Sequence, residues 1–160
     1  MFEQYNDADT PASQSAFDDS ELRQQMSSGA NWFYWIAGLS VVNTVVNFFE
    51  GQWNFAVGLG ITQILDAFSL AAMQEGAPSI VRIVLMLLGL AIAGVFFLFG
   101  VFANRAQTWA FGLGIGLYVL DGLIMLAFGD VLGILIHAFA LYFLVRGFMA
   151  SRQLNALPSQ

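Results

Sequence analysis

Long apolar stretches separated by short polar ones dominate this chain. None of them alternates apolar and polar residues with the period of two that is typical of a strand. Each is about 20 residues long, which is the length an α-helix needs to cross a bilayer core of ~30 Å. Helices also satisfy every backbone polar group inside lipid. The pattern predicts an all-α membrane protein, a bundle of five transmembrane helices over residues 31–49, 53–73, 80–103, 109–128 and 131–150.

The polar ends of the chain set the predicted domain organisation. Residues 1–29 are rich in Ser, Gln and Asp and hold more than half of the eleven acidic residues, so we expect an acidic, flexible N-terminal tail. Within that tail, residues 18–26 have the composition of a short helix. Residues 30–152 form the predicted transmembrane domain, and residues 153–160 form a short C-terminal tail.

The polar connections between the segments predict a topology. Residues 50–52 and 129–130 are too few for anything but tight hairpins, so the segments on either side should be antiparallel neighbours. Five crossings would place the two termini on opposite sides of the membrane. The C-terminal side would then hold three Arg residues and the N-terminal side two, which favours a cytoplasmic C-terminus by one residue.

Composition supports the membrane class and excludes others. The chain is 58% hydrophobic and 10% charged, whereas a typical soluble domain is about 25% charged. The formal net charge of −6 leaves no basic patch to displace phosphate counterions, so nucleic acid is not an expected partner. There is no Cys and therefore no thiolate metal site. We expect an integral protein of the bacterial inner (cytoplasmic) membrane.

Ionisable residues inside the predicted spans are the candidate site. Asp66, Asp121 and His137 lie on three different segments, at one depth if all five segments cross the membrane. Such groups are costly in lipid, so they should face the bundle interior and pair with one another. Gln63 and Tyr118 lie on the same stripes at helical spacing and complete the predicted cluster.

A second polar stripe follows the first segment. Asn43, Asn47 and Glu50 recur every three or four residues and lead towards the opposite end of that segment. Adjacent Asn residues in a membrane helix hold helices together more often than they coordinate an ion.

The chemistry of the cluster leaves three interpretations open. An Asp–His pair at low dielectric can share a proton, which suits a proton relay or a cation site. Two carboxylates and an imidazole also suit a divalent metal, and a lone His can ligate a haem or a chlorin, but the spacing is too weak to predict a metal or a cofactor. The simplest interpretation is an interhelical hydrogen bond between Asp121 and His137, with Asp66 bonded to Gln63 or Tyr118.

These observations favour a function without catalysis. No extramembrane domain is available to hold a substrate, so we do not expect an enzyme. The leading hypothesis is an accessory, assembly or regulatory subunit that packs against a larger membrane partner. The alternative is a small homo-oligomeric, proton-coupled transporter or channel centred on Asp66, Asp121 and His137.

Overall fold

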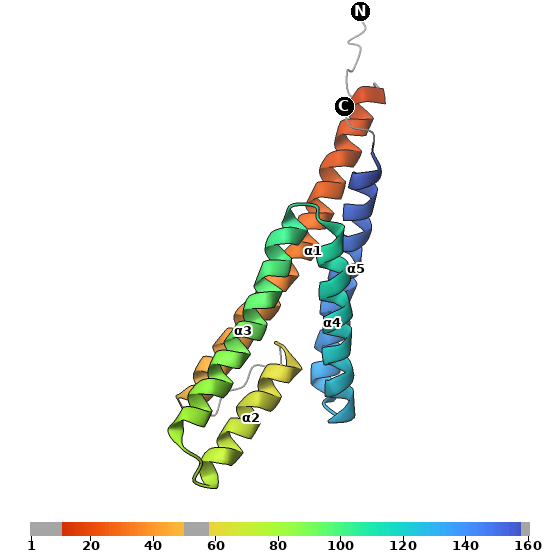
Figure 1. Cartoon of the computed structure of the whole chain (residues 1–160). Helices are drawn as coiled ribbons and strands as arrows, with labels where there is room; N and C mark the ends of the chain where they lie inside the picture. Colours follow the sequence, from red (N-terminus) through yellow and green to blue (C-terminus); the bar gives the residue numbers. More distant parts are fainter. Residues whose placement is uncertain (1–10, 50–57, 158–160) are drawn as a thin grey trace, which may run out of the picture.

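The computed structural model describes residues 11–49 and 58–157, and within these ranges it contains helices and no strands. Helix α1 is followed by a shorter α2 and by three apolar helices that pack as an antiparallel group (Figure 1). The helices are α1 (Pro11–Phe48), α2 (Gly60–Gln74), α3 (Ser79–Asn104), α4 (Thr108–Ala127) and α5 (Val131–Ala156).

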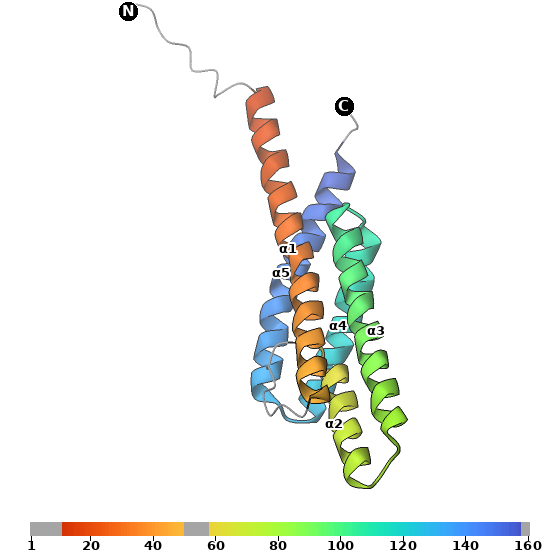
Figure 2. The same cartoon turned by 90° about the vertical axis from the view of Figure 1, so that its left-hand side faces the viewer.

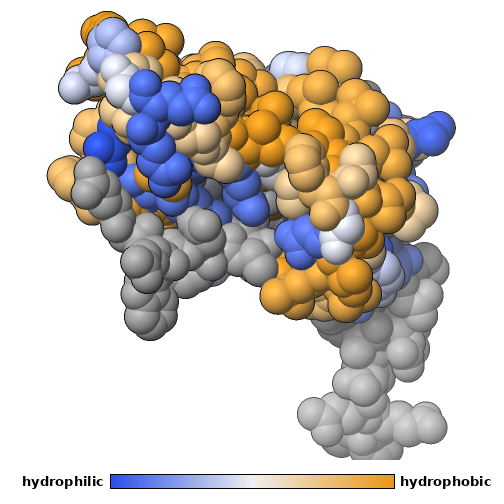
Figure 3. Space-filling view, turned by 90° about the horizontal axis from the view of Figure 1, so that it is seen from below, coloured by the Kyte–Doolittle hydropathy of each residue, from blue (hydrophilic) through white to orange (hydrophobic). Residues whose placement is uncertain are grey.

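Helices α3, α4 and α5 are each long and apolar enough to cross a membrane. Large apolar side chains such as Leu87, Leu113 and Leu135 are more than half exposed on them. Hydrophobic side chains also make up much of the described surface seen from the end that carries the α2–α3 turn (Figure 3). An apolar surface of this extent is compatible with a membrane-embedded protein.

The prediction of five spans is not supported, and α2 gives one reason. Its helix begins at Gly60, seven positions after the predicted start of the 53–73 span, and the predicted residues 53–57 lie outside the described ranges. With 15 residues, α2 is about 22 Å long and falls short of the ~30 Å of a bilayer core.

Helix α1, in contrast to α2, is longer than the predicted span of residues 31–49. It starts at Pro11 and runs for 38 residues, or about 57 Å. The region from residue 11 to 29, predicted as a flexible tail, is therefore helical, while residues 1–10 lie outside the described ranges. The half of α1 predicted to span carries buried polar residues, and α1 is not among the helices apolar enough to cross a membrane.

The first two helices run parallel to each other, which corrects the predicted hairpin. The Leu59 amide donates to Ser40 at 2.7 Å, and further along both helices Thr44 and Asn47 donate to Asp66. Residues later in α1 thus contact residues later in α2, which is possible only if the two helices run in the same direction. The start of α1 and the end of α5 consequently lie at one end of the molecule, as Figures 1 and 2 both show, and not at opposite ends.

Two glycines allow α1 and α5 to cross at close range. A Cβ on Gly29 would lie 2.6 Å from the Gly147 Cα, and one on Gly147 would lie 2.8 Å from the Gly29 Cα. Beside this crossing a cluster of aromatic rings, including Phe33, Phe99 and Phe111, joins α1 to α3 and α4. Helix α5 continues to Ala156, so residues 153–156 of the predicted C-terminal tail, residues 153–160, are also helical.

Candidate functional site

The centre of the candidate site is a hydrogen bond between Asp121 on α4 and His137 on α5. The Asp121 Oδ2 lies 2.8 Å from the His137 Nε2, and both side chains are almost fully buried. Glycines help to bring the helices this close, because a Cβ on Gly122 would touch the imidazole ring. The structure thus brings together two of the three ionisable groups that the sequence placed at one depth.

The protonation of this pair follows from the other imidazole nitrogen. His137 Nδ1 lies 2.8 Å from the Gly133 carbonyl oxygen, which can only accept, so Nδ1 carries a hydrogen. One further proton lies between Nε2 and the carboxylate. Whichever atom holds it, the pair has no net charge, which lowers the cost of burying it in an apolar bundle.

Asp121 also caps the start of α2. Its two carboxylate oxygens accept the backbone N–H groups of Gly60 at 2.7 Å and Ile61 at 2.9 Å. The first N–H groups of any helix lack partners within that helix and carry partial positive charge. A carboxylate from a different helix supplies both the acceptors and the opposite charge.

Other groups complete the start of α2 inside the bundle. The Ser40 hydroxyl accepts the Leu59 N–H, and the Thr62 hydroxyl donates to the Leu59 carbonyl oxygen at 2.7 Å. Gly58 approaches the Ser40 and Asn43 side chains with a φ of +149°, a conformation that favours glycine. Irregular backbone at this depth is tolerated in membrane proteins only where protein or water satisfies it.

Tyr118 packs against the His137 imidazole of this pair. Its ring stacks on the His137 imidazole with centroids 4.4 Å apart and planes 14° from parallel. The side chain is fully buried, and its hydroxyl has no hydrogen-bond partner among the described residues. Tyr118 therefore contributes its ring to the site and does not bond to Asp66.

Asp66 belongs to a different group of polar residues. Its Oδ2 accepts from the Thr44 hydroxyl and the Asn47 amide, each at 3.3 Å, and not from Gln63 or Tyr118. Asp66 lies six residues beyond Gly60, which is about 9 Å along α2. The structure therefore separates Asp66 from the Asp121–His137 pair, and it leaves Gln63 half-buried at the margin of the predicted cluster.

Arg82 connects this second group to the end of α1. Its guanidinium donates to the backbone carbonyls of Phe48 and Asn47 and lies 4.9 Å from the centre of the Phe48 ring. A cation at a helix C-terminus stabilises the unpaired carbonyls there. Asn43 is fully buried, Asn47 bonds back to the Asn43 carbonyl, and Glu50 of the predicted second stripe lies outside the described ranges.

The cavities beside these polar groups are small or apolar. Thr44, Asp66 and Arg82 line a space of about 10 Å³, room for about one water molecule. Asp121 borders a groove of about 260 Å³ whose other walls are aliphatic or aromatic. Within the described ranges, no three His, Cys, Asp or Glu side chains are grouped so that they could hold a metal ion.

Sequence reasoning missed the role of backbone groups at this site. The Gly60 and Ile61 amides and the side chains of Thr44 and Arg82 were not among the predicted residues. One signal was available for the amides. Gly58 and Gly60 interrupt the predicted 53–73 span, and glycine interruptions in a hydrophobic segment are typical of discontinuous membrane helices.

Comparison of the chain with protein-family models, with curated proteins and with solved structures gives no match.

Proposed function

We propose that this protein is a non-enzymatic accessory subunit that packs against a larger membrane partner. The observation that carries this proposal is that the ionisable pair in the interior, Asp121 and His137, already uses its polar atoms in hydrogen bonds within the chain. Asp121 accepts two backbone amides and bonds to His137, and His137 uses both ring nitrogens within the chain. A site that transports an ion needs polar groups that are free to bind it, together with a path for water. This interior is arranged to hold helices in place.

The arrangement supports a topology of four crossing helices and one half-helix. The second half of α1 crosses with α3, α4 and α5, while α2 starts inside the bundle at Gly60 and runs outward. The polar residues Ser40, Asn43, Thr44 and Asn47 on this half of α1 are buried inside the bundle, so they do not face lipid. The burial of Ser40, Asn43 and Thr44 explains why α1 has fewer apolar residues than its neighbours.

The same topology supports a proposal for the orientation. The first half of α1, the α3–α4 connection and the second half of α5 lie towards one end of the molecule, and the start of α3 lies towards the other (Figure 1). The first three segments hold Arg23, Arg105, Arg146 and Arg152, and the start of α3 holds Arg82. Cytoplasmic loops and ends carry the excess of basic residues. The proposal therefore puts both termini in the cytoplasm, because four Arg residues lie towards that end and one lies towards the other.

The partner surface in this proposal includes the first part of α1. From Pro11 to the Gly29 crossing it forms a helical arm with exposed acids such as Asp18 and Glu21. A rigid arm loses less conformational entropy on binding than a flexible tail of the same length. The acids favour a partner with a basic surface at the cytoplasmic face.

A pull-down from solubilised membranes tests this proposal. The full-length protein should retain a membrane protein in stoichiometric amount, and Asp18→Asn combined with Asp19→Asn should reduce that recovery. Arg152→Gln, at the other exposed helix end, is the matched control and should leave it unchanged. Recovery of the protein alone, or equal recovery with both variants, would contradict the proposal.

Proton-coupled transport is the second candidate, because discontinuous helices that start at mid-membrane are typical of transporter sites. It requires the proton of the Asp121–His137 pair to exchange with water on both sides. Proteoliposomes with an internal pH dye measure this directly. Proton flux that Asp121→Asn abolishes, with the fold retained, would favour transport over the subunit role.

A further inference from the structure

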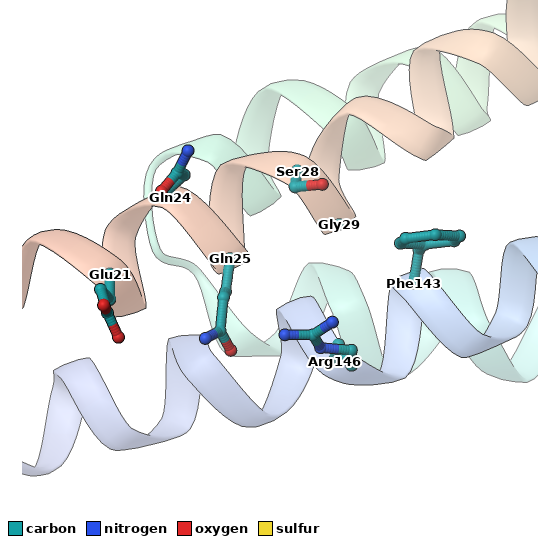
Figure 4. A pocket seen from close by; sticks show the side chains of 7 residues that line it. All are labelled: Glu21, Gln24, Gln25, Ser28, Gly29, Phe143 and Arg146. Atoms are coloured by element: carbon teal, nitrogen blue, oxygen red, sulfur yellow. The ribbon is translucent and has the colours of Figure 1, made fainter. Parts of the chain in front are cut away.

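A polar groove lies between α1 and α5 at the cytoplasmic end assigned above. Its volume is about 410 Å³, and it starts at the Gly29 crossing (Figure 4). Two charged residues of opposite sign line it, Glu21 from α1 and Arg146 from α5, and the Gln25 side chain extends from α1 into the space between them (Figure 4). Among the described residues neither charge forms an ion pair with another side chain.

The apolar and charged residues of the groove follow a fixed order along the membrane normal. Phe143 lies at the apolar end, the Arg146 guanidinium points towards Gln25, and Glu21 is the residue farthest from Phe143 (Figure 4). By helix rise, Glu21 lies about 12 Å beyond the Gly29 crossing. A ligand that fills the groove therefore meets an apolar wall at Phe143, then the Arg146 cation, then the neutral amide of Gln25 and finally the Glu21 anion.

We propose that this groove binds the headgroup of a phospholipid that carries a phosphate and a terminal primary ammonium. The guanidinium of Arg146 donates to the phosphate, for which its planar fork is suited. The Glu21 carboxylate accepts from the ammonium, with the amide oxygen of Gln25 as a further acceptor. The acyl chains then lie along Phe143 on the lipid side. The proposal rests on membrane embedding and not on the subunit role.

The charge order discriminates between headgroups. A quaternary ammonium has no N–H to donate, so the acceptors at the outer end of the groove would lose their hydrogen bonds. A phosphoglycerol headgroup ends in neutral hydroxyls, which can donate to Glu21 but carry no positive charge to pair with its carboxylate. The groove should therefore select a phosphoethanolamine headgroup over phosphocholine and phosphoglycerol.

Native mass spectrometry of the purified full-length protein tests this selection. The protein is mixed with equal amounts of dimyristoyl phosphatidylethanolamine, phosphatidylcholine and phosphatidylglycerol, and the bound fraction of each lipid is measured. We expect the ethanolamine lipid to dominate. Arg146→Gln should lower its binding about two- to fivefold, and Glu21→Gln should remove its advantage over phosphatidylcholine by a similar factor, as exposed charge pairs contribute.

Two matched variants control for a general effect of charge. Arg152→Gln removes a guanidinium on α5 that lies over Phe148, and Asp18→Asn removes an acid from α1; neither residue lines the groove. Both should bind lipid as the wild type does. Equal binding of the three lipids, preference for phosphatidylglycerol, or equal losses in the control variants would overturn the proposal. All four substitutions are at exposed positions, and circular dichroism verifies that helix content is retained.

Discussion

At the scale of single residues, Asp121 joins three helices through one carboxylate. It accepts from two amides of α2 and pairs with His137 of α5, while its own backbone belongs to α4. Asp121 lies seven residues before the tight turn at Phe128, and His137 lies seven residues after its end at Asp130. This equal spacing alone predicted that the two side chains lie at the same depth on neighbouring helices. It did not indicate that the carboxylate also caps a helix far away along the chain.

Replacement of Asp121 by Asn should destabilise the protein by about 2–3 kcal/mol, because one buried N–H at the start of α2 loses its acceptor. Unfolding in detergent, followed by circular dichroism, measures this loss. Asp130→Asn is the matched control. Asp130 caps α5 by accepting the Gly133 N–H at 2.9 Å, and Asn is as good an N-cap as Asp. Equal losses for both variants would argue against the interhelical cap.

Removal of the Tyr118 hydroxyl should have the opposite outcome. Because this buried hydroxyl has no partner among the described residues, Tyr118→Phe should leave stability unchanged or raise it by up to about 1 kcal/mol. Tyr118→Leu should lower stability, because it also removes the ring stacked on His137. A loss of more than about 1 kcal/mol for the Phe variant would mean that the hydroxyl is hydrogen-bonded in the membrane.

At the scale of the elements, glycine positions distinguish helix contacts from lipid-facing surface. Gly29 and Gly147 meet backbone to backbone, whereas a Cβ on Gly112 would meet nothing within 4 Å. The Gly112, Gly114 and Gly116 run looks uniform in the sequence, yet only Gly114 is packed, against the Phe33 ring. Only the structure identifies which of these glycines face a neighbouring helix.

Gly29→Ala should therefore cost about 1–3 kcal/mol, because neither backbone at the crossing can move without repacking. Gly112→Ala is the control and should be neutral or slightly stabilising, since Ala is the better helix former. Thermal unfolding of both variants in the same detergent gives the comparison. A neutral Gly29→Ala would show that α1 and α5 do not cross at this point.

At the scale of the whole molecule, the parallel run of α1 and α2 brings the start of α1 and the end of α5 to one end of the bundle (Figures 1 and 2). In the proposed topology α2 does not cross the membrane, so an even number of crossings remains and both termini lie on one side. Reporter fusions at either end test this topology in cells. We expect a cytoplasmic reporter to be active, and a periplasmic one to be inactive, at both termini. Opposite results at the two ends would restore an odd number of crossings.

A double-cysteine experiment tests the direction of α2 within the membrane. The chain has no Cys, and Thr44 and Ser69 line the same small cavity. Thr44→Cys with Ser69→Cys should therefore cross-link with a short bifunctional reagent. Ser40→Cys with Ser69→Cys is the control pair and should not cross-link. Ser40 lies beside Leu59, which is ten residues before Ser69. An antiparallel hairpin predicts no cross-link for the first pair.

By itself, the sequence determined the helical class and the inward stripes that carry Asp121 and His137. It also gave both bounds of α3 and α4 and the start of α5 to within one residue, but it ended α5 too early. These features depend on apolar runs and on helical spacing, which are local. The tertiary structure alone decided that α2 is a helix of 15 residues that starts at Gly60, that α1 is one long helix from Pro11, and that Asp66 bonds to α1.

The physical reason is that a helix can start inside an apolar bundle only if other segments satisfy its first amides. Asp121 and Ser40 supply those acceptors from positions far from Gly60 along the chain. No window of sequence around residues 53–73 contains them. Hydropathy measures how well a segment avoids water, whereas the partners of a buried helix end depend on which segments the fold brings beside it.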